Sequence, residues 1–201
     1  MTNFKRLFFT NLNGIIHSAY TINADSVKVI KIESNICKGA FSNDMSIDAV
    51  LLSSKSKNIE SSGFENCKEL QLVEYVDGNE ILGNDEENNN AKNKIISSSD
   101  IISIQYHAFK DCTKLHTVIF PYTKNYPHLD IRGKIVLEKE AFLGCKELRT
   151  VVLYNTAVEI ADDAFMGCDT EKLVFVVSEN SDAERFAREH GFRYVHPNNI
   201  N

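Results

Sequence analysis

A repeated unit anchored on phenylalanine constrains the fold of this chain more than any other feature. The anchors are Phe41, Phe64, Phe109, Phe142 and Phe165, and successive anchors are 23, 45, 33 and 23 residues apart. A small residue precedes each anchor directly, and an aliphatic residue stands five positions before it. The base period is therefore 23 residues, with two insertions. Such a period is typical of a solenoid, in which each unit buries its apolar side chains against the next.

The second half of the unit carries a cysteine and an alternating apolar segment. The cysteine follows the last four anchors by three residues, at Cys67, Cys112, Cys145 and Cys168. The apolar segment begins nine residues after the anchor, with one extra residue in the last unit. A period of two predicts a short β-strand that buries every second side chain. We therefore expect five coils of about 23 residues, each adding one strand to a parallel ladder.

These units resemble the BspA-type leucine-rich repeat. The pattern I-x-x-x-A-F-x-G-C-x-x-L-x-x-V-x-L stands at residues 137–153, with Leu137 in its first place, and nearly so at 104–120. The first unit departs from it, because Asp44 replaces the cysteine. The resemblance implies a leucine-rich-repeat solenoid, α/β by convention but rich in β-structure. It also implies a non-catalytic protein-binding or adhesion module, because members are often secreted or bacterial surface proteins.

The chain divides into three parts by this pattern. In the first part, Asn13-Gly14 favours the tight turn of a hairpin that covers the first coil. Alternatively, this part is a decayed repeat, because Ile15 and Ala19 keep the repeat offsets relative to Tyr20. The expected parts are an N-terminal cap at residues 1–28, repeats at 29–178 with inserts at about 77–99 and 121–134, and a C-terminal helix and tail at 179–201.

A capping helix is predicted after the last coil. Ser181 and Glu184 form a capping box, in which each side chain satisfies a backbone N–H group at the start of the helix. Gly191 suits the left-handed conformation that ends a helix. The insert at 77–99 is polar and acidic but lacks the ligand order of an EF-hand, so we interpret it as a solvated loop rather than a calcium site.

No metal, cofactor or catalytic site is expected. Zinc prefers close pairs of thiolates, whereas the repeated cysteines lie at least 23 residues apart, so we expect them to form a buried column of free thiols. Cys37, outside the repeat register, is expected to be another buried thiol. The six histidines are scattered, and neither a nucleophile elbow nor a phosphate-binding glycine motif occurs. An enzyme is therefore not expected.

Charge and hydropathy limit the partners. The net charge is −6 and the basic residues do not cluster, which disfavours nucleic acid. No run of 18 apolar residues could cross a membrane. Asn11, Asn13 and His17 interrupt what would be the apolar region of a signal peptide. The compartment stays open: the resemblance favours the cell surface or secretion, and the cytoplasm is the alternative.

The outward face of the ladder is the predicted binding surface for a protein or peptide. Residues that flank the inward-pointing position of each strand should point away from the core, and nearly all of them are uncharged. We expect them to form an exposed strip that tolerates substitution. The alternatives are β-branched residues that merely suit strands, a structural spacer without a ligand and, more remotely, a hydrolase. The predicted contact residues are Leu51, Leu72, Glu74, Thr117, Ile119, Thr150, Val152 and Val176.

Overall fold

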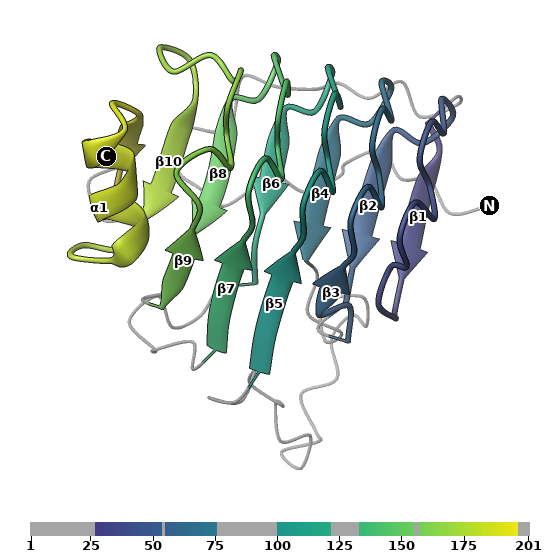
Figure 1. Cartoon of the computed structure of the whole chain (residues 1–201), viewed down its shortest axis with the longest axis horizontal. Helices are drawn as coiled ribbons and strands as arrows, with labels where there is room; N and C mark the ends of the chain where they lie inside the picture. The colour runs from purple at the N-terminus through teal and green to yellow at the C-terminus, as the bar shows by residue number, and fades with distance from the viewer. Residues whose placement is uncertain (1–26, 54, 76–99, 122–132, 155–156, 197–201) are drawn as a thin grey trace, which may run out of the picture.

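The computed structural model describes residues 27–53, 55–75, 100–121, 133–154 and 157–196, which wind into a solenoid with two parallel sheets (Figure 1). In this part of the chain, α1 (Asp182–Glu189) covers the C-terminal end. Sheet A contains, in spatial order, β1 (Val29–Ile32), β2 (Ala49–Leu52), β4 (Leu72–Tyr75), β6 (Thr117–Ile119), β8 (Thr150–Leu153), β10 (Val174–Val177) and β11 (Arg193–Val195). Sheet B contains β3 (Asn58–Ile59), β5 (Asp100–Ile104), β7 (Gly133–Leu137) and β9 (Val158–Ile160).

Sheet A is the ladder that the repeat predicts. Its register joins equivalent positions of successive units, so that Val50, Val73, Val118 and Val151 lie side by side. These four side chains point into the core and are at most 1 % exposed. The ladder also has a strand before the first anchor, because β1 pairs in register with β2. The predicted hairpin and its decayed-repeat alternative lie in residues 1–26, outside the described residues, as does the loop at 77–99.

Sheet B shows that the expectation of one strand per coil is wrong. A second strand forms around the aliphatic residue five positions before the anchor. Its inward side chains include Ile102 and Ile104 in β5, which are 2 % and 1 % exposed. In the first coil the strand shrinks to a single bridge between Ile36 and Ile59. In the early units, the alternation of apolar residues before the anchor is therefore too short to predict a strand from the sequence. After the second insert, the strand β7 begins at Gly133.

The five anchor phenylalanines form one stack through the solenoid. Neighbouring ring centroids lie 5.0 to 5.3 Å apart, with interplanar angles of 2 to 6°. The three central rings are fully buried, whereas Phe41 at the N-terminal end is half-buried. Each central ring therefore packs against two equivalent rings, which explains why the anchor repeats without substitution.

A left-handed residue follows each anchor by two positions. Asn43, Asn66 and Asp111 occupy this position with φ between 57 and 64°, and Gly144 has φ 72°. Asparagine, aspartate and glycine tolerate this conformation best. At Gly144 a Cβ atom would lie 2.6 Å from Oδ1 of Asp111, so any other residue there would have to displace the Asp111 carboxylate in the preceding coil.

The C-terminal helix forms as predicted. Ser181 is the N-cap, and its Oγ accepts a hydrogen bond from the N–H of Glu184 at 3.1 Å. Glu184 in turn accepts from the N–H of Asn180 at 2.6 Å. Gly191 has φ 73° after the helix. The chain then forms β11, which was not predicted: this three-residue strand pairs with β10 and extends sheet A beyond the last coil.

Replacing Phe142 with alanine should lower the free energy of unfolding by roughly 3–5 kcal/mol, because it leaves a cavity between two rings. Phe41→Ala is the matched control and should cost about half as much, since Phe41 is half-buried and stacks on one described ring. Urea unfolding followed by circular dichroism measures both losses. Equal losses would contradict the view that the stack draws its stability from burial on both sides.

Candidate functional site

All eight predicted contact residues lie on the face of sheet A that points away from the main core. Five of them align across neighbouring strands into one row, here called the outward row: Leu51, Glu74, Ile119, Val152 and Val176. Adjacent members are about 4.8 Å apart, the spacing of paired strands. The repeat therefore places these side chains as predicted.

Their burial differs from the prediction. Ile119, Val152 and Val176 are 3 %, 0 % and 1 % exposed and form a separate apolar cluster, against which Tyr154 and Val195 pack. Leu72, Thr117 and Thr150 are buried too. The expectation of an exposed strip that tolerates substitution is therefore wrong for six of the eight residues. Sequence alternation gives the direction of a side chain, but it does not give the burial of an outward face.

The accessible part of this face lies at β1 and β2. Leu51 is half-buried, Val29 is 37 % exposed, and Lys31 is paired in register with Leu51. The Nζ atom of Lys31 lies 2.8 Å from a carboxylate oxygen of Glu33. The hydrogen bond and the charge of Lys31 lower the pKa of Glu33. An apolar spot thus lies among charged groups, a mixture that suits a polar-rimmed protein contact. We call Val29, Lys31, Leu51 and Glu74 the open end of sheet A.

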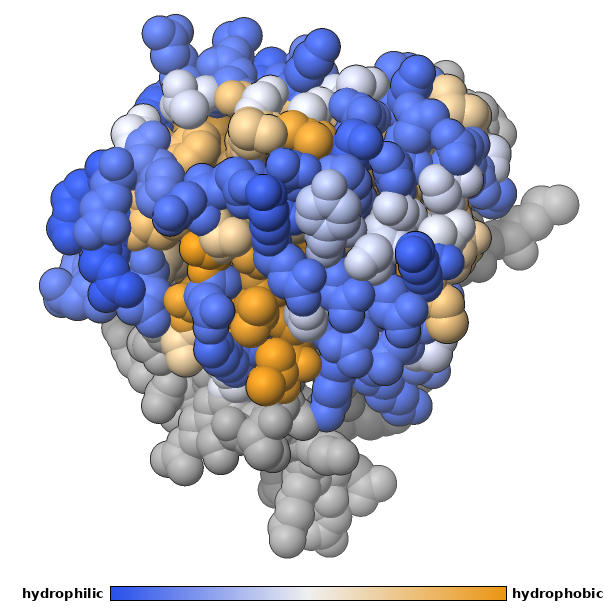
Figure 2. Space-filling model, in the orientation of Figure 1, coloured by the Kyte–Doolittle hydropathy of each residue, from blue (hydrophilic) through white to orange (hydrophobic). Residues whose placement is uncertain are grey.

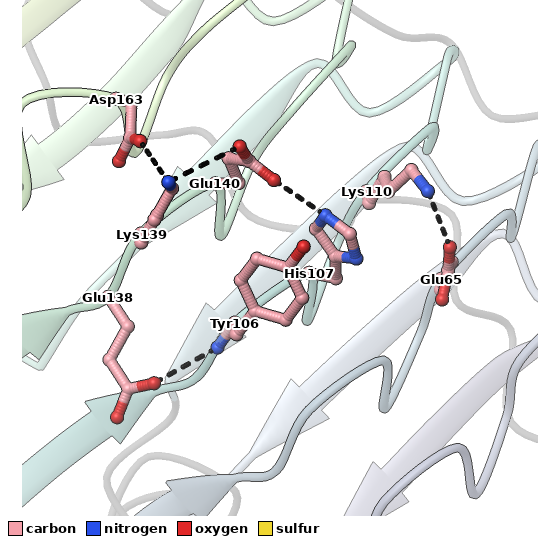
Figure 3. A network of polar contacts seen from close by, with 8 residues as sticks. All are labelled: Glu65, Tyr106, His107, Lys110, Glu138, Lys139, Glu140 and Asp163. Carbon is pink, nitrogen blue, oxygen red and sulfur yellow. Dashed lines mark hydrogen bonds and ion pairs between the residues drawn. The ribbon is translucent and has the colours of Figure 1, made fainter.

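A network of polar side chains crosses the turns of the middle coils (Figure 3). It was not predicted from the sequence. Nε2 of His107 lies 2.7 Å from Oε2 of Glu140, and the ring of Tyr106 stacks on His107 with centroids 3.6 Å apart. From the same coil as His107, Nζ of Lys110 donates to Oε1 of Glu65 in the preceding coil at 3.0 Å. The hydrogen bonds from Ser62 and Lys110 lower the pKa of Glu65.

The signal for this network was the repeat offset. Ser62, His107, Glu140 and Asp163 all stand two residues before an anchor, so equivalent positions in successive coils become neighbours. Among the described residues, no serine or cysteine side chain hydrogen-bonds to His107. The network therefore joins successive coils through hydrogen bonds and ion pairs.

The predicted column of buried thiols is confirmed for three of its four members, whereas Cys168 is half-buried. Cys67, Cys112 and Cys145 are buried, and each Sγ donates to the anchor carbonyl of the preceding coil at 2.9 to 3.1 Å. Burial raises the pKa of Cys145 well above its ordinary value and that of Cys168 to about 12. The prediction for Cys37 is wrong, because this thiol is exposed. It stands four residues before its anchor, the position that Glu60, Gln105 and Glu138 hold in later coils, and so it lies outside the column.

Within the described ranges, no group of three His, Cys, Asp or Glu side chains is arranged to hold a metal ion. The helix in these ranges is too short and too polar to span a bilayer.

The family model described as "BspA type Leucine rich repeat region (6 copies)" matches residues 34–131 and 122–187 of this chain. None of the curated proteins matches significantly. A solved leucine-rich repeat protein from Bacteroides ovatus ATCC 8483 is similar at 19% identity, with a TM-score of 0.44. The match covers 85% of this chain and 42% of that one, so the chain spans less than half of the length of that protein.

A lysine at Val152 should destabilise the protein by at least about 3 kcal/mol, because it buries an unpaired charge in the small outward cluster. Leu51→Lys is the control, on the same row but half-buried, and should change the unfolding free energy by less than about 1 kcal/mol. Thermal melts of both variants test this. A Val152→Lys protein as stable as the control would mean that the outward row is open to solvent after all.

Thiol reagent should modify Cys37 quickly in native buffer and leave Cys67, Cys112 and Cys145 unmodified, because Cys37 is exposed whereas the other three thiols are buried out of reach of the reagent. In denaturant all five cysteines should react. Mass spectrometry after timed alkylation locates the modified residue. Rapid native labelling of Cys112 or Cys145 would show that the column opens.

Proposed function

The chain belongs to the BspA-type leucine-rich repeat family, and from this premise we propose that it is a non-catalytic interaction module that binds a protein or peptide. Repeat modules of this type commonly act in protein interaction. The adhesion roles within the family favour a cell-surface setting for this chain as well. The proposed contact surface is the outward face of sheet A, entered at its open end.

The observation that carries this proposal is the alignment of the outward row. One side chain from each successive strand stands in register, from Lys31 in β1 to Val195 in β11. Buried members of the row cannot make first contact with a partner. Leu51 and Glu74 keep partly exposed side chains, and Val29 and Lys31 lie beside them.

The open end combines the features that a small contact site requires. Apolar area from Val29 and Leu51 can be desolvated by a partner, while the charged groups around it select orientation. The strands beneath are fixed by parallel pairing on an apolar core, so little order has to be gained on binding. A structural spacer remains the competing function, because a continuous core would also stiffen a larger assembly.

Charge reversal at the open end tests the proposal. We expect Lys31→Glu combined with Leu51→Asp to reduce capture of cross-linked partners at least about tenfold, because a buried contact would acquire unpaired charge. Photo-cross-linking from position 29 in the native expression host, quantified by mass spectrometry, measures the capture.

The matched control makes the same two kinds of substitution elsewhere, one on sheet B and one in a turn. Ile101→Asp with Lys114→Glu changes one exposed aliphatic residue and one exposed lysine, and it should leave capture unchanged. An equal loss of cross-linked partner in both variants would mean that capture depends on the overall charge of the protein and not on the open end of sheet A. If the unchanged protein captures no specific partner, the structural spacer is favoured.

A further inference from the structure

A groove lies between β9 and α1, at the end of the solenoid opposite to the open end of sheet A (Figure 1). Its volume is about 420 Å³, within the range of ligand-binding clefts. Ala157, Val158, Ile160 and Phe186 give it an apolar lining. Figure 2 shows apolar surface between the polar side chains of the helix and those of sheet B.

Charged residues surround this lining, and acids predominate. The groove holds the carboxylates of Glu159, Asp162, Asp182 and Glu189 against the two permanent cations of Lys134 and Arg185. Two of the carboxylates are neutralised within the groove. Lys134 pairs with Glu159, and Arg185 lies 2.8 Å from Asp182.

The other two carboxylates stay available. The side chain of Asp162 is 95 % exposed, and its one ion-pairing partner among the described residues is the ring of His190, at 3.4 Å. Glu189 is exposed and forms no ion pair with any described residue. Asp162 follows β9, while Glu189 and His190 end α1, so the excess negative charge collects at one end of the groove.

We propose that the β9–α1 groove binds a short basic segment of a partner protein, in which a bulky apolar side chain is flanked by lysine or arginine. The apolar side chain packs on Val158, Ile160 and Phe186. The flanking cations pair with Asp162 and Glu189. This site is separate from the open end of sheet A, so the two proposals stand or fall independently.

The groove can be tested with a labelled peptide of about ten residues that carries Leu and Phe between Lys and Arg residues. Fluorescence anisotropy with the full chain should show saturable binding with a Kd near about 10–100 µM, which weakens as salt rises from about 50 to 300 mM. Two reference peptides complete the set: one with Glu in place of the basic residues, and one with Gly in place of Leu and Phe. Both should bind at least about tenfold more weakly.

Variants separate the groove from general charge attraction. Asp162→Lys with Glu189→Lys should weaken binding of the basic peptide at least about tenfold. Glu147→Lys with Glu171→Lys alters the net charge equally on exposed residues elsewhere, and it should change the Kd less than about twofold. If the groove variant melts early, Asp162→Asn with Glu189→Gln replaces it, with at least about threefold weakening expected.

The proposal is overturned by any of three results: equal weakening in both charge variants, equal binding of the acidic peptide, or no saturation up to about 1 mM of the basic peptide. Tight binding of the peptide without Leu and Phe would likewise exclude the apolar part of the site.

Discussion

The contact between each coil and the next is the interaction on which the whole structure depends. A single coil cannot cover its own apolar face, so it is stable only when its anchor ring lies against an equivalent ring. The stacked phenylalanines supply the apolar part of this contact. The thiols supply a polar part, because each donates to the anchor carbonyl of the coil before it. A cysteine is thus small enough for the column and still satisfies a buried acceptor.

This dependence explains what could be predicted from the sequence. Anchor, cysteine and sheet A follow from a fixed period, because stacking requires the same residue at the same offset. Sheet B and β11 are harder to predict: their alternation spans three residues or fewer in several units, and a strand that short leaves little pattern. The geometry of the candidate binding surface was predicted only in part. Side-chain direction on the outward row was right, but the burial of Ile119 and Val152 depends on what packs over them, which no local pattern records.

Polar side chains also connect each coil to its neighbour. Glu60, Gln105 and Glu138 stand four residues before their anchors, and each accepts a hydrogen bond from a backbone N–H of the preceding coil. Ala161 holds this position in the last unit and cannot do so. The charge pairs of the turns add to these bonds. A large part of the polar surface in the middle of the solenoid is therefore already paired within the molecule.

Exposed apolar and charged side chains accordingly collect where the stacking ends. At β1 no described strand continues sheet A, so Val29 is exposed and Lys31 lies at the edge. At the other end a helix replaces the next coil. A helix presents side chains at intervals of three and four residues, which cannot match a ladder with one residue per strand. The mismatch between α1 and β9 leaves a groove and two carboxylates, Asp162 and Glu189, without a permanent cation. Both proposed binding sites thus have one physical origin. Stacking buries or pairs the side chains between coils, and it leaves side chains exposed at the two ends of the stack.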